Sequence, residues 1–334
     1  MKLFFRLTLI YMAISVSITA LSRDVGIELA ADAGIATLAF ASLLRDAGSL
    51  AFPVIAIVPF VIGWRNFAAN LDNIAYALLG TVIFQAAFSF VKSTIPFIVP
   101  FYADRYLADF DRWLHGGTDP WVFAHAWAPA IPIERLLNVY MTVWTLAAIG
   151  FIVAVAMTDR DRQRVVRFLV LFFLAWVFLG NVLAVAFSSV GPVFYDQLLG
   201  GDRFAALAAA LAEPPFAGSQ ISTAQGYLWA AYSESGMALG SGISAFPSVH
   251  LGVATMTALY MGERSRWLIL PGVAFVATIL FMSVYTGYHY AVDGYFSILF
   301  MLGLWAMLRR VQNAEARWNW EGFSIRPRQL RTDP

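Results

Sequence analysis

The sequence predicts an all-α fold, a polytopic bundle of membrane-spanning helices. Of the 334 residues, 60% are hydrophobic and only 13% are charged, a balance far from that of soluble domains. The mean hydropathy is +0.69. A helix needs about 20 apolar residues to cross roughly 30 Å of hydrocarbon, a few fewer where flanking side chains snorkel. Eight stretches meet this requirement, and they run over residues 3–21, 48–64, 72–91, 136–157, 166–188, 247–262, 267–285 and 288–308.

Residues 1–71 are predicted to form N-terminal membrane helices and an interfacial helix. The first apolar run follows two basic residues, as in a signal peptide. No small-x-small cleavage site follows it and the run is long, so we expect an uncleaved helix. The stretch 48–64 is the weakest of the eight because it contains Pro53 and Pro59. The preceding "GIELAADAGIATLAFASLLRDAG" contains three acidic residues and is expected to lie in the interface as an amphipathic helix.

The distribution of basic residues predicts how the helices are oriented. With a cytoplasmic N-terminus and eight spans, 15 of the 22 basic residues fall on the cytoplasmic side, mostly in the loop "TDRDRQRVVR" and in a basic cytoplasmic tail, residues 309–334. We therefore expect an integral protein of a bacterial-type inner or plasma membrane. His250 and His289 then lie at helix ends that face the periplasm or exterior. The formal net charge of +1 gives no case for a nucleic-acid partner.

The sequence predicts neither a metal site nor a bound cofactor. It contains no cysteine, which excludes disulfides, thiolate metal sites and a cysteine nucleophile. His115 and His125 have no ligand partners at a convincing spacing, so we expect both to be surface or interfacial residues.

The segment "YTGYHYAVDG", residues 285–294, contains a candidate catalytic pair. On a helix beginning near residue 288, His289 and Asp293 are four apart and share a face. Asp293 would then fix the tautomer of the imidazole while the other ring nitrogen attacks an electrophile. The alternative is a polar pair that pins two helices together, although ionisable groups in membrane helices are functional by default.

A second histidine lies in "SGISAFPSVHLGVATM", residues 241–256. Ser244 or Ser248 suits an N-cap, and the free N–H groups of the following turn form a site for an anion such as phosphate. We therefore expect Ser248 to bind substrate. His250 in that turn is placed to protonate a leaving oxygen and then to deprotonate an incoming hydroxyl. The alternative for a lone histidine at a helix start is a cap or a packing residue.

Two further polar features lie on the same predicted side. Lys92 in "VKSTIPFIVP" ends an apolar helix and is expected to hold a phosphate oxygen, with snorkelling to the interface as the alternative. A mixed-charge cluster follows and reads either as a solvated loop or as a head-group pocket. It consists of Asp104, Arg105, Asp109, Asp111 and Arg112.

Taken together, these motifs resemble those of the type 2 phosphatidic acid phosphatase (PAP2) superfamily. "FPSVH" is followed 39 residues later by a histidine with an aspartate at plus four, which is similar to the second and third motifs of that family. The resemblance implies that His250 is the general acid, that His289 becomes a phosphohistidine and that Asp293 orients it. Lys92 and Pro100 fit the first motif.

The sequence departs from the family pattern at three positions. Val99 and Ser283 stand where the first and third motifs have arginine, and Val249 stands where the second has glycine. A phosphomonoester dianion needs several cations, whereas a phosphodiester carries one negative charge. The departures therefore favour a diester.

The loss of arginines points to the sphingolipid-synthase branch of the family. "HYAVD", "FDRWLHGGTDPW" and "GPVFYD" are similar to segments of that branch, which includes inositol phosphorylceramide synthases. The resemblance covers about residues 72–308 and implies a six-helix catalytic core there. It implies an enzyme that moves a phospho-head-group from a lipid phosphate-ester donor to a lipid alcohol.

Two other functions remain open at this point. A lipid phosphate or polyprenyl pyrophosphate phosphatase uses the same residues with water as acceptor, and arginines folded over the site would favour it. The candidates are Arg105, Arg112, Arg135 and Arg203. A transporter or scaffold would use the histidines for proton coupling or packing, but the spans lack the symmetric halves expected of many transporters. The sequence names neither the lipids nor the oligomeric state.

Overall fold

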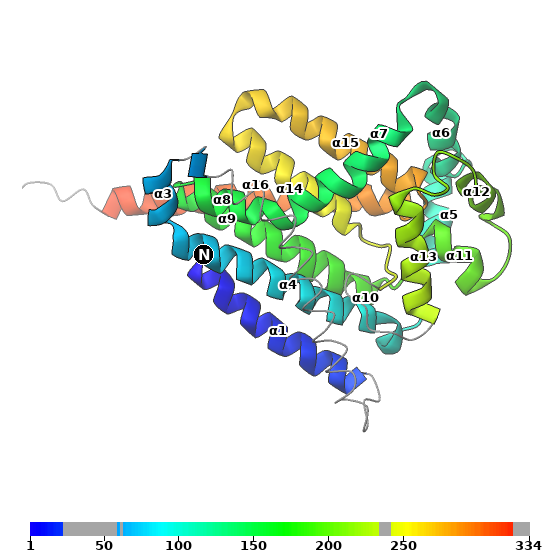
Figure 1. The fold of residues 1–334 in the computed structure, drawn as a ribbon, viewed down its shortest axis with the longest axis horizontal. Helices are drawn as coiled ribbons and strands as arrows, with labels where there is room; N and C mark the ends of the chain where they lie inside the picture. Colours follow the sequence, from blue (N-terminus) through cyan, green and yellow to red (C-terminus); the bar gives the residue numbers. More distant parts are fainter. Residues whose placement is uncertain (23–58, 61–62, 234–241, 323–334) are drawn as a thin grey trace, which may run out of the picture.

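Every element of the described chain is helical (Figure 1), which confirms the all-α prediction. The computed structural model describes residues 1–22, 59–60, 63–233 and 242–322. Long helices form the bundle: α1 (Lys2–Ser22), α4 (Leu71–Ile98), the run α7–η2–η3–α8 (Ile133–Asn138, Val139–Val143, Leu146–Gly150, Phe151–Thr158), the run α9–η4–α10 (Arg162–Phe173, Leu174–Leu183, Ala184–Ala186), α14 (Val249–Arg264), η5–α15 (Arg266–Leu268, Ile269–Tyr285) and α16 (Ala291–Gly322).

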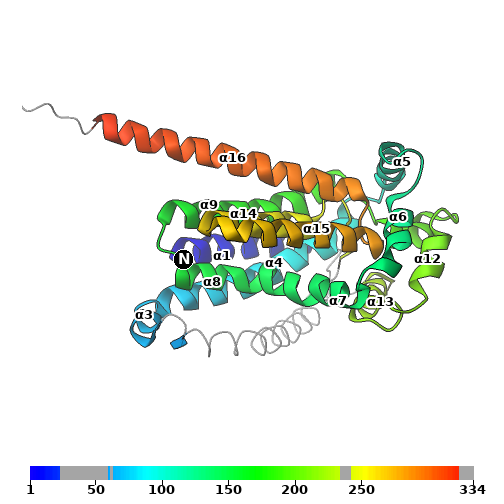
Figure 2. The ribbon, with the colours of Figure 1, turned by 90° about the horizontal axis from the view of Figure 1, so that it is seen from above.

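Shorter helices gather at the two ends of the bundle. One end carries most of them (Figures 1 and 2), and the opposite end carries α3 (Trp64–Ala69) and the N-terminus. The helices of the first group are α5 (Asp104–Leu114), α6 (Pro120–Trp127), η1 (Ala128–Ala130), α11 (Pro192–Leu199), α12 (Ala205–Leu211) and α13 (Gln220–Ser233).

Six helical runs of the described residues are long and apolar enough to cross a membrane. They match six of the eight predicted stretches, and apolar side chains such as Leu3, Leu270 and Leu299 point away from the protein on their outer faces. A polytopic helical membrane protein is thereby confirmed. The predicted span 48–64 lies almost wholly outside the described residues, as does the predicted interfacial helix.

Two predicted boundaries need correction. The stretch 247–262 forms α14, which has 16 residues, most of them buried among the other helices, so it is a short central helix and not one of the six long spans. Helix α16 does not end near residue 308 but continues to Gly322, because no proline or glycine occurs between residues 309 and 321, so the predicted tail begins inside a helix.

Aromatic residues fill the core between α1, α4 and α9. Phe84 packs on Phe172 with 4.9 Å between ring centroids, and Phe4 packs against both rings. Gly80 of α4 permits this approach, because a Cβ there would lie 2.7 Å from the Phe4 ring. Helices α1 and α4 run parallel, since Phe4 lies beside Gly80 and Thr19 lies beside Thr94. Lipid tails are as apolar as the helices, so the hydrophobic effect does not drive helices together inside a membrane. Close packing of this kind holds them together instead.

Helix α14 passes through the centre of the bundle and links its two ends. It contacts α15, α16, α9 and η4. Its first turn lies at the end that carries most of the short helices, close to the beginning of α16 (Figure 1). Segments 39 residues apart in sequence, those carrying His250 and His289, are thus brought together at one end of the bundle.

Candidate active site

His289 lies in the tight loop between α15 and α16. Helix α15 ends at Tyr285, Gly287 adopts a left-handed conformation with φ 70°, and α16 begins only at Ala291. The helix expected to begin near residue 288 thus begins at Ala291, and His289 lies outside it. Gly287 reverses the chain after α15, and buried carboxylates cap α16 only from Tyr290 onward. The His289 N–H donates to Ser283 O at 3.2 Å, which folds the loop back onto the end of α15.

Asp293 still meets His289, but through a helix cap. Asp293 is the third residue of α16, and its Oδ2 accepts the N–H of Tyr290 at 3.0 Å, which is the backward bond of a capping box. The same Oδ2 lies 3.4 Å from His289 Nδ1. The carboxylate is fully buried and the imidazole nearly so. One ring nitrogen therefore faces a carboxylate, as expected of an oriented nucleophile.

The other ring nitrogen of His289 faces His250. His289 Nε2 and His250 Nδ1 are 3.3 Å apart. The His250 ring stacks on Tyr140, with 5.1 Å between centroids and an 8° angle between planes, and packs on Trp144. Trp144 Nε1–H also donates to His250 O at 3.0 Å. These two aromatics hold the ring in place, and Tyr140 belongs to the π-helical turn η2, a deviation that often occurs at functional sites.

Ser248 caps α14 and lies outside the cavity beside the histidines. Its hydroxyl is fully buried and accepts the N–H of Leu251 at 3.3 Å, as expected of an N-cap. The backbone N–H of Ser248 donates to Asp293 O at 3.4 Å, which ties the start of α14 to that of α16. Substrate binding by Ser248 stays a prediction.

A cavity of about 300 Å³ opens beside the two histidines. One face of α4 contributes Gln85, Phe88, Ser89 and Lys92, whose spacing of three and four residues forms a stripe along the helix. Aromatic side chains form much of the remaining wall. The cavity is thus an apolar space with a narrow polar stripe, the usual character of a small-molecule site.

Lys92 is the one cation among the described residues that line this cavity. Its ammonium lies 5.8 Å from the centre of the Phe88 ring. Gly242, with φ 114°, packs directly on the Lys92 backbone, where a Cβ would lie 2.8 Å from the carbonyl. The structure therefore places Lys92 together with His250 and His289, as the sequence predicts.

The arginines that a phosphatase would use lie elsewhere. Arg105, Arg112, Arg135 and Arg203 do not line the cavity. Arg112 donates to Gly117 O at 2.7 Å, and Arg203 pairs with Asp109 at 2.5 Å and with Asp119 at 3.5 Å.

The acidic residues of the mixed-charge cluster separate into two kinds. Asp104 and Asp111 are 0% and 2% exposed, so neither a solvated loop nor a head-group pocket describes them. Their carboxylates accept backbone N–H groups of two segments, Val190–Gly191 and Ala291–Val292, which lie on either side of the loop that carries His289. Burial raises the pKa of Asp104 and raises that of Asp111 to about 6, because it outweighs the hydrogen bonds that favour the charged form. Their spacing of seven places both on one helical face, a signal that the sequence offered.

His115 and His125 lie outside the cavity. His115 Nδ1 is 2.7 Å from Asp111 O and its Nε2 is 3.0 Å from the Tyr295 hydroxyl, while His125 Nε2 is 2.9 Å from Tyr285 O. Within the described part of the chain, no three His, Asp or Glu side chains come close enough to hold a metal ion.

A family model of the PAP2 superfamily matches residues 105–307, more than half of the chain. The chain belongs to the PAP2 superfamily. The match contains His250, His289 and Asp293 but begins after Lys92, so the first motif rests on geometry alone. No curated protein and no solved structure matches the chain. Members of this superfamily are typically phosphatases or phosphotransferases, which supports an enzyme with activity of this type.

Proposed function

We propose that this member of the PAP2 superfamily is a membrane phosphotransferase. It moves a phospho-head-group from a phospholipid to a lipid alcohol, as inositol phosphorylceramide synthases do. The observation that supports this most directly is the arrangement of His289 between Asp293, 3.4 Å from Nδ1, and His250, 3.3 Å from Nε2. Both histidines lie at the wall of a cavity whose described lining includes one lysine.

The proposed reaction proceeds through two displacements at phosphorus. In the first, the lone pair of His289 Nε2 forms the N–P bond while the bond from phosphorus to the departing lipid alcohol breaks. His250 gives the leaving oxygen its proton. In the second, His250 takes the proton of the acceptor hydroxyl, whose oxygen attacks phosphorus and releases His289. Asp293 stabilises the ring while it carries positive charge. The two imidazoles must part to admit the phosphoryl group.

The charge of the cavity supports a phosphodiester donor. A monoester dianion gathers further charge on its equatorial oxygens during transfer and is usually held by several cations. Lys92 supplies one positive charge here, and the four arginines considered above are bonded elsewhere or lie away from the cavity. One cation balances the single charge of a diester.

Hydrolysis is the alternative. A lipid phosphate or polyprenyl pyrophosphate phosphatase would use the same phosphohistidine, with water in place of the acceptor alcohol. Membership of the superfamily supports this function equally.

The proposed orientation follows from the ends of the helices. The turns at 159–161 and 264–266 carry several arginines, and they lie at the far end of α14 from His250 (Figure 1). By the positive-inside rule that end is cytoplasmic, and the cavity then opens toward the periplasm or exterior.

The test is a transfer assay with purified protein. It is incubated with a mixed phospholipid pool labelled in the head group, and the lipids are separated by thin-layer chromatography and mass analysis. Transfer of label to a second lipid is expected with wild type and with His125→Gln, which keeps a donor to Tyr285 O, but not with His289→Ala. Label released only as the water-soluble phosphorylated head group would establish hydrolysis instead. Equal products from wild type and His289→Ala would refute both functions.

A further inference from the structure

Helix α5 lies across the beginning of α16, outside the bundle (Figure 2). It is amphipathic: Tyr106, Phe110 and Trp113 are exposed, while Asp104 and Asp111 are buried on the opposite face. Two carboxylates in such a position lose their hydration, so they require partners that repay it.

Asp111 supplies the hydrogen bonds that the first turn of α16 lacks. Its Oδ2 accepts the N–H of Ala291 at 3.0 Å and its Oδ1 accepts the N–H of Val292 at 3.1 Å. With Tyr290 N–H bonded to Asp293, the first backbone donors of the helix all have carboxylate partners. An anion beside a helix N-terminus also interacts favourably with the helix dipole.

Asp104 fixes the other side of the loop that carries His289. It accepts the N–H groups of Val190 and Gly191, at 2.9 and 3.0 Å, and the hydroxyl of Tyr290 at 2.9 Å. Gly191 in turn packs against Tyr288 O, where a Cβ would lie at 2.5 Å. One carboxylate thus joins the segment before α11 to the residue that follows His289.

We propose that Asp104 and Asp111 are positioning residues that act through the backbone to hold His289 and Asp293 in reacting geometry. This rests on the proposed function. They do not line the cavity and are too buried to meet substrate. Carboxylates suit this role because both of their oxygens accept hydrogen bonds, whereas an asparagine amide has one acceptor oxygen and turns an NH2 donor toward the second backbone N–H. They support the loop from outside the membrane-spanning helices.

The first test compares Asp111→Asn with Asp109→Asn. Asp109 lies on the same helix, but its side chain is 61% exposed and pairs with Arg203 at the surface. Displacing a catalytic group by about 1 Å can cost on the order of 10²-fold in rate. We expect kcat for Asp111→Asn to fall by about that factor with KM nearly unchanged, and Asp109→Asn to stay within about twofold of wild type. A Tyr290→Phe variant, which deletes only the hydroxyl bonded to Asp104, should show a smaller loss of kcat.

The second measurement is independent of turnover. The chain has four histidines, so ¹⁵N-histidine NMR spectra can be assigned with single variants. We expect Asp111→Asn and Tyr290→Phe to shift the ring nitrogens of His289 while leaving His125 unchanged, and Asp109→Asn to shift neither. An unchanged His289 spectrum in both variants would overturn the proposal. If these variants shift the His289 signals but the wild-type protein shows no phosphoryl transfer, the positioning role stands and only the proposed function is refuted. If Asp111→Asn does not fold, Tyr290→Phe decides.

Discussion

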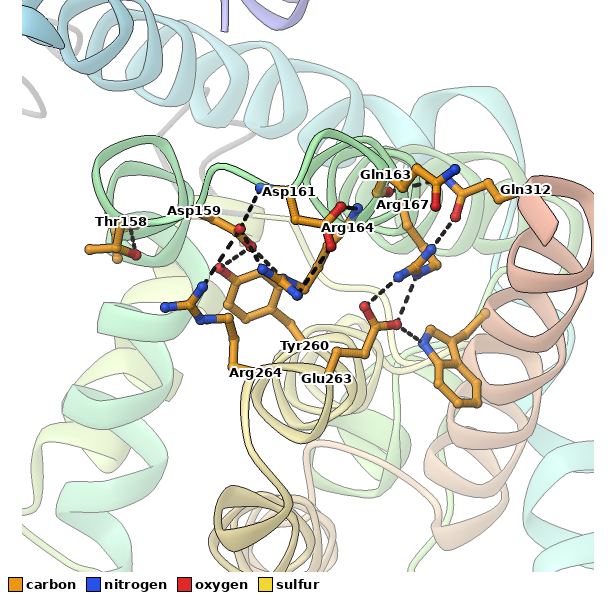
Figure 3. A network of polar contacts seen from close by, with 12 residues as sticks. Thr158, Asp159, Asp161, Gln163, Arg164, Arg167, Tyr260, Glu263, Arg264 and Gln312 are labelled. Carbon is orange, nitrogen blue, oxygen red and sulfur yellow. Dashed lines mark hydrogen bonds and ion pairs between the residues drawn. The ribbon is translucent and has the colours of Figure 1, made fainter. Parts of the chain in front are cut away.

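The two ends of α14 carry polar clusters of opposite character. At the end away from the histidines, the side chain of Asp159 is fully buried and both of its oxygens are bonded (Figure 3). Arg164 donates to Oδ1 and Oδ2 at 2.6 Å each, and Tyr260 donates to Oδ2 at 2.8 Å. Arg264 adds an ion pair at 3.6 Å. Although burial acts to raise it, these bonds lower the pKa of Asp159 to about 2.

A second group completes this network. Arg167 of α9 donates to Glu263 of α14 through Nε and Nη2, at 2.8 and 2.5 Å, and it also bonds Gln312 of α16. The Trp305 indole donates to the same glutamate. Helices α9, α14 and α16 are thereby fixed to one another at this end.

The histidine end is left incomplete by comparison. Among the described residues, His289 Nδ1, Asp293 Oδ1 and Gln85 Nε2 are buried without a hydrogen-bond partner. Buried polar groups are nearly always satisfied, and exceptions gather where strain or a ligand is part of function. One end of α14 is thus held by fully bonded charges that stabilise the fold, whereas the other leaves polar atoms that could bond a ligand under the proposed function.

The largest expected effect is at the histidines. His289→Ala should abolish phosphoenzyme formation, because it removes the proposed nucleophile, and His250→Ala should block transfer, because the leaving oxygen then lacks its acid. Acid-labile, base-stable incorporation of ³²P from a labelled donor measures the first, and lipid product measures the second. Full activity in either variant would show that the histidine end of α14 is not the catalytic site.

Asp293→Asn should follow with a loss of kcat on the order of 10²–10⁴-fold, because the amide no longer favours the reacting orientation and charge of His289. Single-turnover phosphorylation isolates this step from product release. A rate equal to that of wild type would mean that the 3.4 Å contact with His289 is structural.

Asp159→Asn tests the opposite end. It leaves Arg164 and Arg264 without their buried partner, a change that typically costs about 3–5 kcal/mol of stability. Thermal unfolding in detergent should show a lower melting temperature, while kcat measured well below it should stay within about twofold of wild type. Loss of turnover at unchanged stability would contradict the division between the two ends.

Gln85→Leu should have a milder effect on the cavity. Its free donor is available to an acceptor oxygen of the substrate, and one such bond is worth about 1.4 kcal/mol, or roughly tenfold in KM. Steady-state kinetics should show the rise in KM with kcat little changed. Gln163→Leu, exposed at the other end, serves as the control. An unchanged KM would show that the polar stripe does not contact substrate.

The smallest expected effect is a difference between the two ends of α14 in how their carboxyl groups change stability with pH. The pKa of Asp111 is raised to about 6 above an unfolded value near 3.9, so its contribution to stability is greatest below about pH 4 and is lost as pH rises through 6. Asp293, His115 and Tyr295 face this carboxyl. The pKa of Asp159 is lowered, so its contribution persists above about pH 4 and is lost only toward pH 2.

The measurement is the melting temperature at pH 7 and pH 5. The part of its change that depends on Asp111, on the order of 3 °C, should disappear in Asp111→Asn and remain in Asp159→Asn. If the change in melting temperature instead disappears in Asp159→Asn and remains in Asp111→Asn, the carboxyl that titrates between pH 5 and 7 lies at the Asp159 end, which would contradict the prediction.

The sequence could predict the features that follow from local pattern. Apolar length located six spans, and the motif spacing brought Lys92, His250 and His289 to one cavity. The sequence correctly predicts that His289 and Asp293 lie together, but for the wrong reason. A helix cap brings them together, and not a shared helical face. Gly287 carried the signal for that break.

Other parts of the site depend on tertiary structure. Tyr140 and Trp144 stack on His250 from a helix more than a hundred residues away, and no local pattern distinguishes them from lipid-facing aromatics. The roles of Asp104 and Asp111 also require knowledge of which backbone groups they meet. The fate of the four arginines required the fold as well.

The shortness of α14 has a consequence for the surrounding bilayer. Its 16 residues extend about 24 Å, some 6 Å less than the usual hydrocarbon thickness, and its two ends lie beside the Asp159 network and at His250. If the arginine-rich end sits at the membrane surface, a lipid phosphate reaches His250 only where the leaflet dips by that amount. The protein should then thin the membrane around itself, and host lipids with shorter acyl chains should ease the descent of the phosphate toward His289.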